Sequence, residues 1–173
     1  MKPVHLLVLV VGAMMILGPS ALAAGATARV AFGKAAAVAQ RWQGDAVPVS
    51  ISTLAVRPDG TAASWSYIFY SPKRQQGYSV ATQNGEIVDT GEVTGHLKAP
   101  IDREFVDSDQ AITEAGKHGL SGKNETTMSL LVMGQSTDSP GLYWTVSRGF
   151  DKGDVSVVID ARSGEFSYEN QMP

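Results

Sequence analysis

The stretch WSYIFYSPKRQQGYSVATQNGEIVDT, residues 65–90, has a counterpart 79 positions further along the chain, WTVSRGFDKGDVSVVIDARSGEFSYE at residues 144–169. The alignment needs no gap, and it places Trp65 on Trp144 and Gly85 on Gly164. A shared period of this length predicts two copies of one supersecondary unit packed together. It favours a folded binding module over a chain organised around a single catalytic pocket.

The first half of the chain is predicted to fold as one helix followed by four strands. Residues 27–42 are rich in alanine, with apolar residues three or four positions apart, which is typical of a helix. Residues 47–56 are rich in β-branched residues and read as the first strand. The third and fourth strands, 77–83 and 86–93, are joined at Asn84-Gly85, which is a strong hairpin signal.

The second strand, residues 62–70, alternates between two faces. Trp65, Tyr67 and Phe69 share one face, and Ile68 and Tyr70 share the other. A tryptophan at the equivalent position of an alternating strand in both halves is more simply a core residue than half of a ligand-stacking pair. We therefore expect Trp65 and Trp144 to be buried.

The second half repeats this order of elements. A helix is expected over residues 109–118, with Ser108 as its N-cap and Gly119 closing it. Strands are expected at 126–133, 142–149, 154–161 and 165–168. The predicted fold is α+β, with two α-β-β-β-β units that are each an antiparallel sheet covered on one face by a helix. Whether the two sheets join into one is left open.

The predicted domain organisation has four segments. Residues 1–23 combine Lys2, a nearly continuous apolar run and a small-residue recognition site, so they read as a secretory signal peptide cut between Ala23 and Ala24. Retention of this segment as a membrane anchor is the alternative. Residues 24–93 form the first unit, 94–106 the linker and 107–173 the second unit. We expect an exported protein, periplasmic or extracellular, with no stable membrane span once the signal is removed.

Composition excludes several functions. Of 173 residues, 43% are hydrophobic and 18% charged, so the chain can build a packed core. The formal net charge is -3 and no cluster of Lys or Arg stands out, so nucleic acid is not an expected partner. The absence of cysteine excludes disulfides, thiolate chemistry and a lipid anchor attached through cysteine.

The residues offer little for catalysis. His96 and His118 are the histidines outside the signal peptide, and no second ligand lies at metal-binding spacing from either. No G-x-S-x-G sequence is present to form a nucleophile elbow. We expect no catalytic residues, no cofactor and no metal, and hence a protein that is not an enzyme.

The second half resembles a PepSY domain. The resemblance is carried by SDQAI at 108–112, YWTV at 143–146 and VVIDARSGEF at 157–166, and it covers about residues 107–168. The first half matches more weakly through NGEIV at 84–88. The resemblance implies an extracytoplasmic domain that restrains peptidases or binds other proteins, with no catalytic residues to transfer. The tandem arrangement is also similar to that of secreted β-lactamase inhibitor proteins, although those depend on disulfides that this chain lacks.

The function expected from these observations is that of an exported, non-catalytic module that binds a protein or peptide and inhibits or regulates an extracytoplasmic peptidase or other partner. Ile68 and Tyr70 are candidate partner-binding residues because they project from the strand face opposite Trp65. Phe69 and Arg148 are added because they occupy equivalent positions yet differ between the halves. The alternative is a periplasmic carrier that holds a small molecule or metal in a pocket between the units.

Overall fold

The computed structural model describes residues 25–94, 99–120, 126–134, 140–148 and 154–171. The predicted signal peptide, with Ala23 and Ala24, lies outside these ranges, as does His96. The elements are α1 (Ala28–Trp42), β1 (Val47–Val56), β2 (Ser64–Ser71), β3 (Gln76–Gln83), β4 (Glu86–Val93), α2 (Ser108–Ala115), η1 (Gly116–Leu120), β5 (Thr126–Met133), β6 (Gly141–Ser147), β7 (Val155–Asp160) and β8 (Phe166–Gln171).

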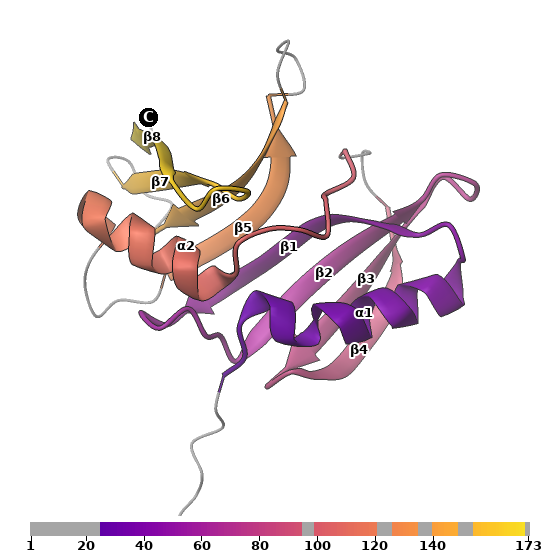
Figure 1. The fold of residues 1–173 in the computed structure, drawn as a ribbon. Coiled ribbons are helices and arrows are strands. Elements are labelled where there is room, and N and C mark those ends of the chain that lie inside the picture. Colours follow the sequence, from indigo (N-terminus) through magenta and orange to yellow (C-terminus); the bar gives the residue numbers. More distant parts are fainter. Residues whose placement is uncertain (1–24, 95–98, 121–125, 135–139, 149–153, 172–173) are drawn as a thin grey trace, which may run out of the picture.

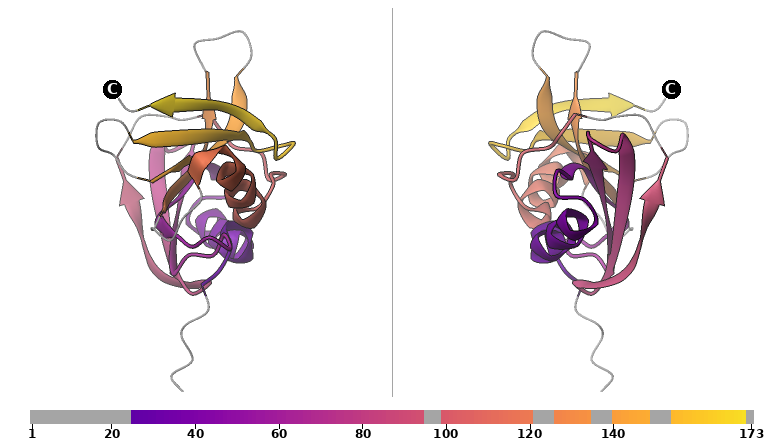
Figure 2. Two further views of the ribbon diagram at one scale, coloured as in Figure 1. Left: turned by 90° about the vertical axis from the view of Figure 1, so that its left-hand side faces the viewer. Right: turned by 90° about the vertical axis from the view of Figure 1, so that its right-hand side faces the viewer.

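The eight strands form one antiparallel sheet in the order β4-β3-β2-β1-β5-β6-β7-β8. The pairing of β1 with β5, in which Ile51 lies opposite Leu130, joins the strands of the two halves. The strands of the two halves therefore make a single continuous sheet. The sheet is strongly twisted, so that β7 and β8 run nearly across the direction of β2 and β3 (Figure 2).

Both helices lie on the same face of this sheet (Figure 1). The side chains directed towards them form a fully buried row that crosses six strands, in which each member is paired with the next. The members of this row are Val80, Tyr67, Ile51, Leu130, Trp144 and Ile159. Helix α1 covers β1 to β4, and α2 covers β6 and β7. The alternation along the strands therefore turns one sheet face into the core.

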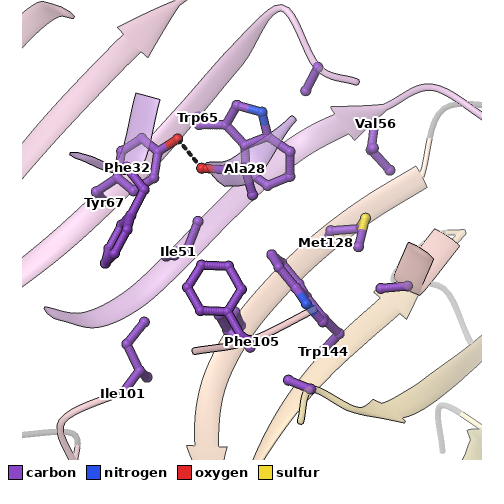
Figure 3. Packing of buried hydrophobic residues seen from close by; sticks show 14 of the residues in the cluster. Ala28, Phe32, Ile51, Val56, Trp65, Tyr67, Ile101, Phe105, Met128 and Trp144 are labelled. Atoms are coloured by element: carbon purple, nitrogen blue, oxygen red, sulfur yellow. Dashed lines mark hydrogen bonds between the residues drawn. The ribbon is translucent and has the colours of Figure 1, made fainter. Parts of the chain in front are cut away.

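Aromatic rings connect the two halves within this core (Figure 3). Trp65 and Trp144 meet edge to face with ring centroids 6.3 Å apart, and Phe105 packs against Trp144 at 6.1 Å. Phe32 of α1 contacts both Phe105 and Tyr67, at 5.6 and 6.2 Å. The prediction that both tryptophans are buried is confirmed. Edge-to-face pairs add to the stabilisation that burial of the rings already provides.

Polar atoms of these rings are satisfied by the backbone at the helix starts. The indole nitrogen of Trp65 donates to the carbonyl of Ala26 at 2.7 Å, and that of Trp144 donates to the carbonyl of Val106 at 2.8 Å. Each carbonyl belongs to the residue before the N-cap of the helix in the same half. The Tyr67 hydroxyl donates to the carbonyl of Ala28 at 2.8 Å, and burial raises the pKa of this phenol.

The N-terminus of each helix is capped by the same carboxylate. Asp107 is the N-cap of α2, where it forms a capping box with Gln110. Its oxygens also accept the Thr27 hydroxyl at 2.7 Å and the Arg29 backbone N–H at 3.0 Å, both at the start of α1. The prediction of Ser108 as the N-cap is wrong by one residue. The Ser108 hydroxyl instead joins the halves, accepting from the Ala28 N–H at 3.0 Å and donating to the Gly60 carbonyl at 2.7 Å.

The β1–β2 turn packs closely against the start of α2. Gly60 has φ +79°, and a Cβ built on it would lie 2.2 Å from the Asp109 Cα. Glycine is therefore required for two reasons, the left-handed conformation and the absence of space. This contact places an element of the first half directly against a helix of the second.

The predicted turns and boundaries agree closely with the structure. Asn84 and Gly85 have φ values of +50° and +80°, as a type I′ hairpin requires. Helix α2 is shorter than predicted, since it ends at Ala115 and is followed by the wide turn η1, in which Gly119 has φ +89°. In the described ranges, neither helix has the length and apolar character needed to cross a membrane.

The shared cap predicts a large effect for one carboxylate. We expect Asp107→Ala to lower the free energy of unfolding by about 1–4 kcal/mol, because two helices each lose an N-cap interaction normally worth about 0.5–2 kcal/mol. Asp109→Ala, in the same helical turn but exposed, is the matched control and should cost less than about 1 kcal/mol. Urea denaturation measures both changes, and equal costs for the two variants would contradict the shared cap.

Candidate binding face of the sheet

The sheet face opposite the helices carries a row of small hydroxyl side chains. Strand pairing places Ser66 opposite Ser52, Ser52 opposite Ser129, and Ser129 opposite Thr145, so the row crosses β2, β1, β5 and β6. Its members are half-buried, and each is a sequence neighbour of a residue in the buried apolar row. We call this surface the open face, since no helix of the described residues covers it (Figure 2).

Larger side chains border the hydroxyl row. Leu131 and Tyr143 form the next cross-strand pair on this face, and Tyr168 pairs with Val158 at its β8 end. Tyr168 is exposed and Tyr143 is half-exposed. The open face thus has small hydroxyl side chains in its middle and larger tyrosine and leucine side chains beside them. Aromatic side chains with one polar atom are common at recognition surfaces because they offer apolar area and a hydrogen bond together.

A cavity of about 280 Å³ opens on this face beside the junction of β1 and β5. Its lining is uncharged among the described residues and comprises Ser52, Thr53, Leu54, Thr127, Met128, Ser129, Thr145, Ser147 and Ser156. Ser147 and Ser156 are both buried, and their hydroxyl oxygens are 2.7 Å apart in a mutual hydrogen bond. The cavity therefore combines an apolar wall with hydroxyl groups that are already hydrogen-bonded.

A β-bulge lies at the edge of this cavity. The register between β1 and β5 shifts between Thr53 and Val56, and the Ala55 N–H bonds to the Thr53 hydroxyl at 3.3 Å. Leu54, within the bulge, is 80% exposed although β1 is a central strand of the sheet. Bulges occur preferentially beside functional sites, where they redirect a side chain. Here the bulge presents an aliphatic side chain to solvent next to an uncharged cavity.

The predicted partner-binding residues divide between the two faces. Ile68 is half-buried on the open face, and Tyr70 on the same side is 8% exposed. Phe69 is 1% exposed in the core, and this burial removes it from the surface available to a partner. Arg148 is half-buried just beyond the end of β6. The structure brings Ile68 and Tyr70 together on β2 and does not place Arg148 with them.

Sequence reasoning missed Leu54 and the hydroxyl row. Ser50 and Ser52 precede Leu54 at alternate positions of the same strand, so an aliphatic residue interrupts an otherwise polar outward set. That interruption is the signal that would have drawn attention to Leu54. The row itself depends on which strands are neighbours, and the pairing of β1 with β5 connects residues that are far apart in sequence.

Two shallower hollows lie on the helix side. One of about 360 Å³ runs between α2 and the turn that contains Ser163, and one of about 460 Å³ is lined partly by Arg29 and Arg162. They share Val106 and Gln110 in their linings. The lining of both is largely polar and exposed. Among the described residues there is no group of three His, Asp or Glu side chains placed to hold a metal ion.

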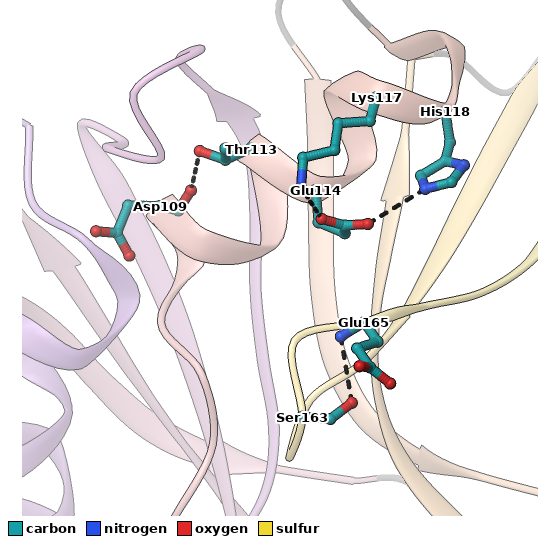
Figure 4. A network of polar contacts seen from close by, with 7 residues as sticks. All are labelled: Asp109, Thr113, Glu114, Lys117, His118, Ser163 and Glu165. Atoms are coloured by element: carbon teal, nitrogen blue, oxygen red, sulfur yellow. Dashed lines mark hydrogen bonds and ion pairs between the residues drawn. The ribbon is translucent and has the colours of Figure 1, made fainter.

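Glu114 is the centre of a charged network beside the first hollow (Figure 4). Lys117 Nζ lies 2.6 Å from one carboxylate oxygen, and His118 Nε2 lies 3.3 Å from the other. The hydrogen bond from Lys117, followed by that from His118, lowers the pKa of the Glu114 carboxyl from its ordinary value. The His118 ring also stacks on Phe166, the first residue of β8, with centroids 3.9 Å apart. This network links α2 and η1 to the edge strand β8.

Comparison with known proteins supports the fold alone. The chain is similar in structure to a "putative lipoprotein" from Clostridium difficile 630, with a TM-score of 0.53 and 14% sequence identity over 79% of this chain and 89% of that chain. No protein-family model matches, and no curated protein matches significantly by sequence. The resemblance to PepSY domains therefore stays a prediction, whereas the α+β architecture with an eight-stranded antiparallel sheet is established.

The hydroxyl pair in the cavity predicts a non-additive pair of substitutions. Ser147→Ala and Ser156→Ala should each cost about 1 kcal/mol, because each leaves the other hydroxyl buried without this partner. The double variant should cost no more than either single change, because it removes both polar groups. Urea denaturation of the three variants measures the coupling, and additive costs would show that the two hydroxyls do not depend on each other.

The pKa of Glu114 should depend on Lys117. The pKa of the Glu114 carboxyl is lower in the folded protein than in the unfolded chain. The charged carboxylate therefore stabilises the fold at pH values above the unfolded-state pKa of about 4.3, and this stabilisation is lost as the pH falls through the folded-state pKa. Lys117→Met should raise the Glu114 pKa towards its ordinary value, whereas Lys34→Met on α1 should leave it unchanged. Carbon-13 NMR titration of the side-chain carboxyl measures this, and an unchanged midpoint in Lys117→Met would refute the assignment of cause.

Proposed function

We propose that the protein is an exported, non-catalytic module that binds another protein through the open face of its sheet. The observation that carries this proposal is the hydroxyl row Ser66-Ser52-Ser129-Thr145, which is uncharged, lies in the middle of the sheet and is not covered by a helix of the described residues. Small side chains let a partner approach the sheet closely, and half-buried hydroxyls keep the capacity to donate and accept hydrogen bonds.

The tyrosines around the row favour a protein partner. Tyr168 continues the row beyond Thr145, because Val158 pairs with Thr145 on one side and with Tyr168 on the other, and Tyr143 lies two residues before Thr145 on β6. Tyrosine is enriched in protein interfaces and among the residues that dominate their binding energy. An uncharged centre bordered by tyrosine also matches the depletion of charged residues at interface cores.

The resemblance to PepSY domains supports an extracytoplasmic partner, with a peptidase that the module inhibits or regulates as the leading class. The signal-like segment 1–23 supports export, and the description of the structural neighbour as a lipoprotein agrees with it. We also propose that the fold arose from two PepSY-like units. The matching bonds from Trp65 to the Ala26 carbonyl and from Trp144 to the Val106 carbonyl, together with the mirrored strand order, support this origin.

A carrier function is the second candidate. It is favoured by the hollow of about 460 Å³. This hollow is lined by Arg29 of α1 in the first half together with Glu104, Gln110 and Arg162, which follow the first half in the sequence. This volume is within the range of roughly 300–1,000 Å³ that is typical of small-molecule sites. Thermal unfolding with a panel of metabolites and metal ions discriminates, because a ligand that binds only the folded state raises the midpoint.

Site-specific crosslinking tests the open face as the binding surface. The chain has no cysteine, so Ser66→Cys and Ser129→Cys each create one attachment point for a photoactivatable maleimide. With the mature chain 24–173 in the host's extracytoplasmic fraction, both variants should crosslink to the same protein. That protein, once purified, should bind the unlabelled chain, and if it is a peptidase its activity should change on binding.

Exposed positions on the helices provide the control. Arg41→Cys on α1 and Thr113→Cys on α2 carry the same label on the opposite side of the molecule. They should give no crosslink to this partner, because the sheet lies between them and the open face. Crosslinking from the helix positions with none from Ser66 and Ser129 would refute the assignment of the binding surface.

A further inference from the structure

We infer that the cavity beside Leu54 is an anchor pocket that receives one uncharged aromatic side chain, a tyrosine, from the partner protein. The inference rests on the proposed function and specifies which part of the open face holds the partner and by what chemistry. Three properties of the cavity lead to it: the charge of its lining, its size and the placement of its polar atoms.

The lining excludes a charged occupant. None of its described members is acidic or basic, and the floor is formed by the buried pair Ser147 and Ser156. An ionised side chain placed there would lose its hydration without gaining an opposite charge, which is strongly unfavourable. Lysine, arginine, aspartate and glutamate of a partner are therefore disfavoured, and an uncharged side chain is selected.

The size of the cavity indicates one side chain. Its volume of about 280 Å³ lies just below the range of roughly 300–1,000 Å³ for sites that enclose a whole small-molecule ligand. A partner protein need insert only one residue, because the remainder of the open face supplies the other contacts. Single aromatic anchors in pockets of this kind commonly dominate the energy of an interface.

The polar and apolar atoms are arranged for a ring with a hydroxyl group. Leu54 provides aliphatic surface at the β1–β5 junction and is 80% exposed, so an inserted ring would bury it. Ser129 and Thr145, paired across β5 and β6, provide hydroxyl groups on the same side. Tyrosine has an apolar ring and one polar atom, so it satisfies both regions of the lining.

The pocket can be tested with a small tyrosine derivative. N-acetyl-L-tyrosinamide should bind the mature chain with a dissociation constant of the order of 1 mM, the range expected for a ligand of this size. Methyl-selective NMR should show the shift changes concentrated at Leu54, Thr127 and Thr145. N-acetyl-L-lysinamide at the same concentrations should produce none at these methyl groups, because the lining has no counter-charge.

Two variants on the open face separate the pocket from the rest of the surface. Thr145→Arg places a long cationic side chain at the pocket and should raise the dissociation constant at least about tenfold. Ser64→Arg, on β2 of the same face but outside both the hydroxyl row and the lining, should leave it unchanged. Thermal unfolding of each variant confirms that it is folded, and Leu54→Ser, at an exposed position, provides a second variant that should also weaken binding.

The outcomes distinguish this inference from the proposed function. Shift changes spread over the whole surface, equal binding of the lysine derivative, or retention of binding by both Thr145→Arg and Leu54→Ser would overturn the pocket. So would preferential binding of methyl glucoside, which would indicate a neutral sugar, or a concentration-dependent dimer that shields these methyl groups, which would indicate a second copy of the chain. Crosslinking from Ser66 and Ser129 can succeed while these results fail, in which case the face binds a partner without this anchor.

Discussion

The position of Asp107 between two helix starts is the constraint on which the rest of the structure depends. The first N–H groups of a helix have no partners within it, and here a single carboxylate serves those of both helices. The Ser108 hydroxyl next to it reaches both α1 and the β1–β2 turn. Since these groups bring the two helices together, they also determine that both lie on one face, and the opposite face is left for other uses.

Strand alternation alone separates the apolar core of the sheet from its open face. Neighbouring residues such as Tyr67 and Ser66, or Leu130 and Ser129, point to opposite sides, so one register serves an apolar core and a hydroxyl surface at once. Changes on the hydroxyl side need not disturb the aromatic cluster of Trp65, Trp144 and Phe105. The side chains of the open face can therefore change while the packing of the core is preserved.

Local signals explain which parts of the fold were predictable. Strands β1, β4 and β5 begin and end where β-branched composition and the Asn84-Gly85 turn place them, and the buried tryptophans follow from alternation. The N-cap was misplaced by one residue because Asp107 and Ser108 are both good caps, and only the long-range bonds to Thr27 and Gly60 decide between them. Phe69, a predicted partner-binding residue, is buried in the core, as its alternation with Trp65 and Tyr67 on β2 already indicates. The hydroxyl row and the cavity depend on the β1–β5 pairing, which no local pattern specifies.

That central pairing has a kinetic consequence. Strand β1 ends at Val56 and its partner β5 begins at Thr126, so the middle of the sheet cannot form until most of the chain is available. The first turn of helix α1 likewise cannot be capped until residues 107 and 108 are available. Contacts between such distant segments slow folding, because the long loop between them must close, with a loss of chain entropy, before the stabilising contacts form. A chain that crosses a membrane before it folds would gain from this delay, since the central β1–β5 pairing cannot form until both segments have arrived.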